Sequence, residues 1–214
     1  MFNPEILKDK RKMAMYTPEE KDLLKRYFAY AGGCFSKPMT DDEYLAKVDE
    51  KLKSLNIYQR ALKKTGLDED DVKSWEIAPM EFGNFLYGNG AETGHTGNYT
   101  NKYQVSWFFL SDTEIYFYQY TLDMLSQSAK ESCEEYFYKD ITSFATDEDT
   151  TEINLVSMKG CPKRPVNVKG TKTITSLKVV VPGDKFSLAA KAGEDLENKV
   201  KAMKNKLREK KNNG

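Results

Sequence analysis

The single histidine, His95, is the first residue to test for catalytic or metal-binding chemistry. It lies in a glycine-rich stretch, GNGAETGHTG, that begins at Gly88. A histidine needs partner residues to act as a base or a zinc ligand, and the chain has no second histidine. The glycines could cradle a phosphate, but no Lys-Ser/Thr pair follows them and the flanking residues predict strands. We therefore expect a flexible, solvated histidine in a long hairpin connection.

Four consecutive acidic residues that begin at Asp68 resemble a cation site at first sight. An EF-hand loop counted from Asp68 would need an oxygen ligand at position 5, a glycine at position 6 and a glutamate at position 12. Those positions hold Val72, Lys73 and Pro79. The motif therefore fails, and we expect Asp68 to cap a short helix that carries the other acids in its first turn.

The three cysteines lie far apart and form no CxxC pair, as is typical of a reducing cytoplasm. They are Cys34, Cys133 and Cys161. Cys161 stands near Lys163 and Arg164, two cations that could lower the pKa of its thiol. Without a base or a second cysteine nearby, a rigid turn is the favoured interpretation. We predict no catalytic residue, no metal site and no cofactor.

Charge is balanced over the chain but unevenly distributed along it. The 33 basic and 33 acidic residues argue against a dedicated nucleic-acid-binding protein, which needs a net basic surface. Residues 131–152 carry eight acids and one base, whereas residues 199–211 carry seven bases and one acid. The candidate partner-binding residues in the basic stretch are Lys199, Lys206, Arg208 and Lys210.

Three interpretations of the basic stretch stay open. Its lysines could form a solvated face at a helix C-terminus, or they could meet an acidic partner, such as the 131–152 surface of another copy. They could also bind an anionic membrane or nucleic acid.

The first third of the chain predicts helices. Capping boxes begin at Thr17 and Thr40, and predict helices over 17–31 and 40–55, followed by a shorter helix over 57–65. The apolar faces of the first two helices are too large to remain in water, so we expect them to pack within the chain. They are formed by Leu23, Leu24, Tyr27 and Phe28, and by Tyr44, Val48, Leu52 and Leu55.

After Trp75 the apolar residues alternate, which predicts strands. The strongest signal is an aromatic-rich hairpin, with strands at 103–110 and 114–122 joined by a turn at 111–113. Further strands are predicted at 134–146, 151–158, 173–181 and 185–190. The chain then ends in one amphipathic helix over about 193–211. Its apolar stripe is Leu196, Val200, Met203 and Leu207.

This order of strands followed by one helix resembles the pleckstrin-homology-like (PH-like) fold. Residues 136–144, residues 183–188 and the closing helix most resemble its bacterial members, and residues 62–79 resemble a linker of uncharacterised bacterial proteins of that kind. The resemblance implies an antiparallel β-barrel or sandwich whose open end is plugged by the C-terminal helix. Phosphoinositide-binding members hold the headgroup with basic residues in the first interstrand loop. Residues 83–101 contain no Lys or Arg, so the resemblance implies an interaction module and not phosphoinositide binding.

We therefore expect an α+β protein with an α-helical segment at 1–74 and a PH-like antiparallel β domain with its helix at 75–214. The expected function is that of a non-catalytic interaction or scaffold module that binds a protein partner. Peripheral binding to an anionic membrane or to nucleic acid through the basic C-terminal helix is the alternative. The sequence contains no stretch of 18 apolar residues and no apolar stretch after a basic start, so we expect a cytoplasmic protein without a signal peptide.

Overall fold

The predicted α+β order is present in the computed structural model, with helices first, strands next and one helix last. The structure describes residues 9–28, 37–88, 90–159 and 164–212, without the side chains of 154–159 and 164–167. The N-terminal helices are α1 (Lys10–Ala14), α2 (Pro18–Leu23), the π-helix η2 (Leu24–Phe28), α3 (Asp41–Leu55), α4 (Ile57–Thr65) and α5 (Glu69–Ser74). The strands are β1 (Met80–Phe85), β2 (Lys102–Leu110), β3 (Glu114–Asp123), β4 (Ala129–Phe137), β5 (Ser143–Lys159), β6 (Arg164–Val181) and β7 (Asp184–Ala190), and the last helix is α6 (Glu194–Asn212).

The predicted helix starts are confirmed by their caps. The Thr17 hydroxyl accepts a hydrogen bond from the Glu20 amide, and the Glu20 carboxylate accepts one from the Thr17 amide, at 3.2 and 2.8 Å. Thr40 caps α3 in the same way, and the Asp68 carboxylate caps α5 by accepting from the Asp70 amide at 2.8 Å. The helix predicted over 17–31 differs, because α2 ends at Leu23 and widens into η2. Residues 29–31 lie outside the described residues.

The strands form two antiparallel sheets, of order β1-β2-β3-β4 and β5-β6-β7. The aromatic hairpin is confirmed, with Leu110 opposite Ile115 across the β2–β3 turn. The predicted turn between the last two strands is also present, since Val181 faces Asp184 and Gly183 has a φ of +86°. Over the described residues, backbone hydrogen bonds do not join the two sheets into a closed barrel.

The prediction of one strand over 134–146 is wrong. The chain turns after Phe137, where the Asp140 amide donates to the Phe137 carbonyl at 2.9 Å, and β5 starts at Ser143. Tyr138 and Ile141 are both buried in the core, and their spacing of three breaks the alternation of a strand. The turn carries the chain from the four-stranded sheet to the three-stranded sheet.

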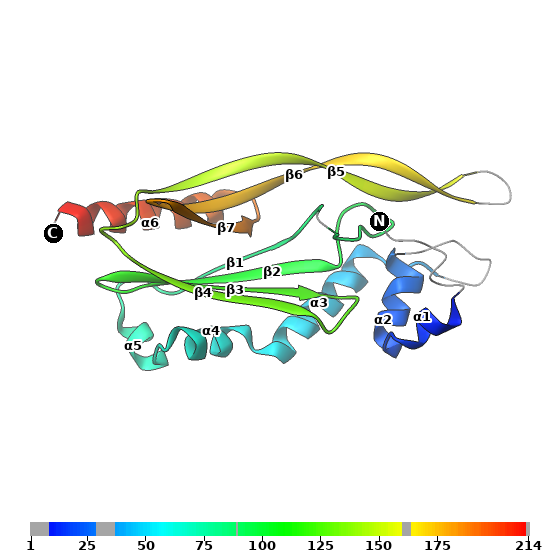
Figure 1. Cartoon of the computed structure of the whole chain (residues 1–214), viewed down its shortest axis with the longest axis horizontal. Coiled ribbons are helices and arrows are strands. Elements are labelled where there is room, and N and C mark those ends of the chain that lie inside the picture. Colours follow the sequence, from blue (N-terminus) through cyan, green and yellow to red (C-terminus); the bar gives the residue numbers. More distant parts are fainter. Residues whose placement is uncertain (1–8, 29–36, 89, 160–163, 213–214) are drawn as a thin grey trace.

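Helices α3, α4 and α5 cover one face of the four-stranded sheet, which we call the outer face (Figure 1). The predicted apolar helix faces pack here, within the chain, against the outer-facing side chains of β2 and β3. Tyr27 stacks on Tyr44 with ring centroids 4.1 Å apart, and Tyr58 packs on Trp107 at 4.8 Å. The N-terminal helices and the sheet therefore share one hydrophobic core.

The inner face of the same sheet packs against the three-stranded sheet and α6, the layer above it in Figure 1. Phe108 and Phe117 of the four-stranded sheet pack on Phe186 of β7, with centroids 6.3 and 5.1 Å away. Strands β2 and β3 are thus buried on both faces, and the chain forms three layers.

Strand β7 crosses the inner face of the four-stranded sheet, and side-chain amides bond to its backbone. The Asn84 amide donates to the Ala190 carbonyl at 2.7 Å, and the Gln104 side-chain oxygen accepts from the Ala189 amide at 2.8 Å. The Gln119 amide donates to the Ser187 carbonyl at 3.2 Å. These bonds satisfy backbone amide and carbonyl groups along the edge of β7, where a closed barrel would place another strand.

We predict that Gln104→Leu lowers the free energy of unfolding by about 1–3 kcal/mol, because the buried Ala189 amide loses its acceptor. Gln119→Leu is the matched control, and we expect less than about 1 kcal/mol because its bond lies at the surface. Urea denaturation of both variants measures the difference. Equal losses of unfolding free energy in the two variants would show that the buried bond of Gln104 contributes no more to stability than the exposed bond of Gln119.

Candidate binding site

The candidate site lies along α6, and its position follows from the apolar stripe of that helix. The four predicted residues of the stripe are buried in the core between the two sheets. Burying them fixes the rotation of α6 about its own axis. One flank of α6 then turns toward the four-stranded sheet, and the other toward β5 and β6.

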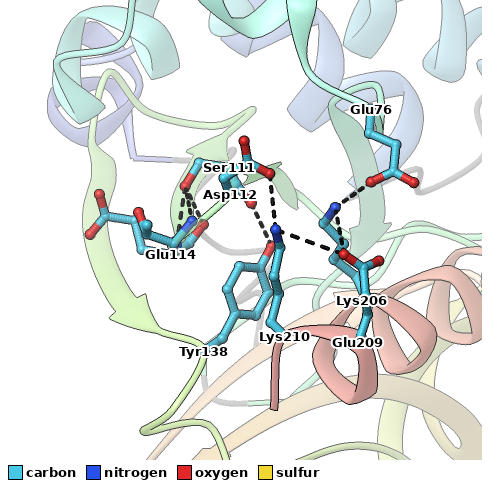
Figure 2. Close-up of polar contacts among 9 residues, drawn as sticks. Glu76, Ser111, Asp112, Glu114, Tyr138, Lys206, Glu209 and Lys210 are labelled. Carbon is cyan, nitrogen blue, oxygen red and sulfur yellow. Dashed lines mark hydrogen bonds and ion pairs between the residues drawn. The ribbon is translucent and has the colours of Figure 1, made fainter. Parts of the chain in front are cut away.

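Ion pairs hold the first flank in place. Figure 2 shows the Lys206 ammonium between Glu76, which precedes β1, and Glu209 of α6 itself. Lys210 reaches Asp112 in the β2–β3 turn, with Nζ 3.0 Å from the carboxylate, and lowers the pKa of Asp112. The Lys206 side chain is only 4% exposed. Its burial acts to lower the pKa of the ammonium, but the carboxylates around it outweigh burial and raise that pKa.

Lys199 also bonds within the chain. Its ammonium donates to the Glu81 carbonyl of β1 and to Asp195, both at 2.7 Å, and lies 5.1 Å from the centre of the Phe82 ring. Of the four residues predicted from the sequence to bind a partner, Lys199, Lys206 and Lys210 therefore fasten α6 to the four-stranded sheet. Arg208 lies on the opposite flank, where it lines a groove.

The groove runs between α6 and the three-stranded sheet and has a volume of about 440 Å³. Its walls come from α6 and the residues just before it, and from β5 and β6: Thr146, Glu148, Thr175, Ala192, Gly193, Leu196, Glu197, Val200, Lys201, Lys204, Asn205 and Arg208. In the described part of the chain, none of its three cations makes an ion pair. The groove thus contains three of the cations of α6 that form no ion pair within the described residues.

Of the three cations that line the groove, Arg208 is among the residues predicted from the sequence to bind a partner, and Lys201 and Lys204 are not. A signal for them exists, because Glu197, Lys201, Lys204 and Arg208 repeat the 4-3-4 spacing of the apolar stripe, one residue later. Residues that follow a buried stripe by one position lie at the border of the buried surface. The opposite border belongs to Lys199, Lys206 and Lys210, and each of these lysines has one partner that lies far away in the sequence: the Glu81 carbonyl, Glu76 and Asp112 respectively.

The two ends of the groove differ in charge. Lys204 and Arg208 belong to the C-terminal half of α6, which lies at the same end of the molecule as the start of β5 (Figure 1). Glu197 belongs to the first turns of α6, and Glu148 lies further along β5. The arrangement can hold a ligand through charge and hydrogen bonds.

The acidic stretch 131–152 does not form one acidic surface. Glu131 accepts from Tyr118 at 2.6 Å and pairs with Arg60 at 3.2 Å. Asp147 pairs with Lys178. Glu134 and Glu135 face opposite sides of β4, as the alternation predicted, since their cross-strand partners Phe117 and Tyr116 lie in different cores.

His95 is anchored, and the prediction of a flexible, solvated side chain is wrong. Its backbone amide donates to the Tyr27 carbonyl at 2.9 Å, and its Nε2 lies 3.0 Å from the Met39 carbonyl oxygen. Its ring packs edge-on against Tyr27, with centroids 5.5 Å apart. The glycine-rich stretch is the connection between β1 and β2, as predicted, but it packs on the N-terminal helices.

A carboxylate cluster beside His95 has a structural explanation. The Asp41 carboxylate accepts hydrogen bonds from Tyr27, Thr96 and Asn98, each at 2.7 Å. Partial burial acts to raise the pKa of Asp41, but these bonds outweigh it and lower that pKa. Gly94 leaves no room for a side chain, because an added Cβ would lie 2.2 Å from the Tyr27 ring. The cluster fastens the β1–β2 connection to α3.

Other candidate chemistry is not assembled in the described residues. These contain no group of three or more His, Cys, Asp or Glu side chains that could hold a metal ion. Desolvation of the sulfur and the nearby Glu135 and Glu134 raise the pKa of the Cys133 thiol, which disfavours the reactive thiolate. Cys34 and Cys161 lie outside the described residues. No helix in the described ranges is long and apolar enough to span a membrane.

Comparisons with known proteins give no match: no protein-family model matches the chain, and neither does any curated protein or solved structure.

We predict that Glu76→Gln lowers the free energy of unfolding by about 1 kcal/mol, because the buried Lys206 ammonium loses its nearest carboxylate. Lys206→Met, which keeps the packed side-chain stem and removes the charge, should cost less.

Because the pKa of Lys206 is raised above 10.5, its charged form is the stabilised one. The penalty of Glu76→Gln should therefore be constant near neutral pH and shrink as the pH rises above about 10.5. Urea denaturation across pH measures both effects, and a larger loss for Lys206→Met would contradict this account.

Proposed function

We propose that the chain is a non-catalytic protein-interaction module with a PH-like arrangement, and that the groove along α6 binds an acidic segment of a partner protein. The division into sheets of four and three antiparallel strands, followed by one helix, supports the PH-like arrangement. The hydrogen bond that anchors His95 to Met39 supports a non-catalytic role for this histidine.

The observation that carries the proposal is the unequal use of the cations on the two flanks of α6. On one flank, Lys199, Lys206 and Lys210 all meet carboxylates within the chain. On the other, Lys201, Lys204 and Arg208 line the groove and form no ion pair with any residue that the structure describes. Unpaired cations that share a groove attract an anionic ligand and repel a basic one.

The shape of the site favours a protein segment over a membrane or nucleic acid. The cations lie along a groove whose wall also includes Glu148 and Glu197, so a ligand with its negative charge confined to one end fits better than a uniformly anionic lipid surface or phosphate backbone. A flat lipid surface or a duplex gains from a broad basic surface, and internal pairing of Lys199, Lys206 and Lys210 narrows that surface here. An acidic peptide is narrow enough to enter.

We predict that Lys204→Glu/Arg208→Glu weakens binding of a glutamate-rich, fluorescein-labelled synthetic peptide at least tenfold, measured by fluorescence anisotropy at fixed salt. The matched control is Lys25→Glu/Lys63→Glu, which makes the same change in net charge at exposed lysines of η2 and α4. It should change affinity less than twofold. Circular dichroism should be unchanged in both variants.

Equal weakening by both variants would mean that overall charge, and not the groove, attracts the peptide. Anionic vesicles and duplex DNA serve as further probes over a salt series. Binding to either with a steep salt dependence, and without binding of the peptide, would favour the membrane or nucleic-acid alternative over this proposal.

A further inference from the structure

Within the described part of the chain, strand β5 has a backbone partner along only one of its two edges. It is the outermost strand of its sheet, and β6 occupies that edge from Ser143 to Lys159. Across the described residues, no other backbone hydrogen bond reaches β5. An edge strand of this length presents a row of free amides and carbonyls that can pair with another extended chain.

The free edge of β5 borders the groove along α6. Thr146 and Glu148 of β5 both line the groove, and they share a strand face with the buried Phe144. A chain paired with β5 would therefore direct every second side chain into the groove. Residues 143–146, at the start of β5, carry no charge, and this start lies at the same end of the molecule as the C-terminal half of α6 (Figure 1).

We propose that the partner segment is extended and adds as a further strand to the free edge of β5, with acidic side chains at two successive groove-facing positions. This inference rests on the proposed function of the groove. Lys204 and Arg208 are separated by about 6 Å along the axis of α6. Side chains on one face of a strand repeat every ~6.7 Å, so two consecutive groove-facing acids match these two cations.

Glu148 and the uncharged residues 143–146 set the register of the added strand. Glu148 repels an acid directly opposite it, so the acidic positions lie beside the uncharged residues 143–146. A neutral or basic residue fits opposite Glu148. The segment therefore carries its acids toward the Arg208 end of the groove and lacks them toward Gly193.

Pairing of β5 with β5 of a second copy is disfavoured by charge. Asp147, Glu148 and Asp149 lie in a row on β5, and a symmetric antiparallel pair centred there would place like charges opposite one another. These three acidic residues thus disfavour pairing of β5 with a second copy of itself. The uncharged residues 143–146 can still pair with a partner of different sequence.

The test uses the full-length chain and a synthetic peptide that alternates threonine or valine with two successive glutamates. Two further peptides carry N-methyl groups on every second amide, on one edge of the strand or on the other. N-methylation removes donors from a single edge, so one of these peptides should bind at least tenfold more weakly and the other within twofold of the parent. The β5 amides that do not face β6 should gain protection from hydrogen exchange when the parent peptide binds.

A charge swap separates this inference from the proposed function. A peptide with lysine in place of the two glutamates should bind Lys204→Glu/Arg208→Glu and not the unmodified chain. If the charge swap succeeds but both N-methylated peptides behave alike, the groove binds acidic segments without strand addition and the inference is wrong. If the parent peptide fails to bind, or binds Lys204→Glu/Arg208→Glu equally well, both proposals fail. A stable dimer in sedimentation that excludes the peptide would also overturn the inference.

Discussion

The structure depends on one constraint, which is that the β2–β3 hairpin carries large apolar side chains on both of its faces. Phe108 and Phe117 face each other across the hairpin on the inner side, and Trp107 and Tyr118 do so on the outer side. A sheet with two apolar faces needs a cover on each. The N-terminal helices cover the outer face, and β7 with α6 covers the inner one. Burial of the apolar stripe of α6 in this core fixes the rotation of the helix. That rotation determines which of its cations bond to the four-stranded sheet and which line the groove.

Local signals predicted much of the fold. The capping boxes at Thr17 and Thr40, the aromatic hairpin and the turn at Gly183 each depend on a few neighbouring residues, and all are present. The transition from β4 to β5 was missed because it depends on tertiary packing of Tyr138 and Ile141. A strand before the glycine-rich stretch was expected, but its bounds were not predicted, since the residues of β1 gain a strand conformation through pairing with β2 and Gly83 weakens the local pattern.

The different surroundings of the α6 cations could not be predicted from the sequence, for a related reason. Helical spacing alone places the buried stripe of α6, but not the carboxylates that its lysines meet. Lys206 pairs with Glu76 across 130 residues, and Lys210 with Asp112 across 98. Without these contacts every lysine of the basic stretch looks equally free, and three of the four chosen residues proved to hold the helix in place. His95 was misjudged in the same way, because Tyr27 and Met39 lie far from it in sequence.

The claim that the β2–β3 hairpin needs a cover on both faces is tested most directly by native-state hydrogen exchange of the full chain at increasing denaturant. If the N-terminal helices are a required cover for the hairpin, the slowest amides of α3 and α4 should open together with those of β2 and β3. They should share one free energy of opening and one dependence on denaturant. If α3 and α4 instead exchanged through a separate opening of much lower free energy while β2 and β3 stayed protected, the outer face would not need its helices and the account would be contradicted.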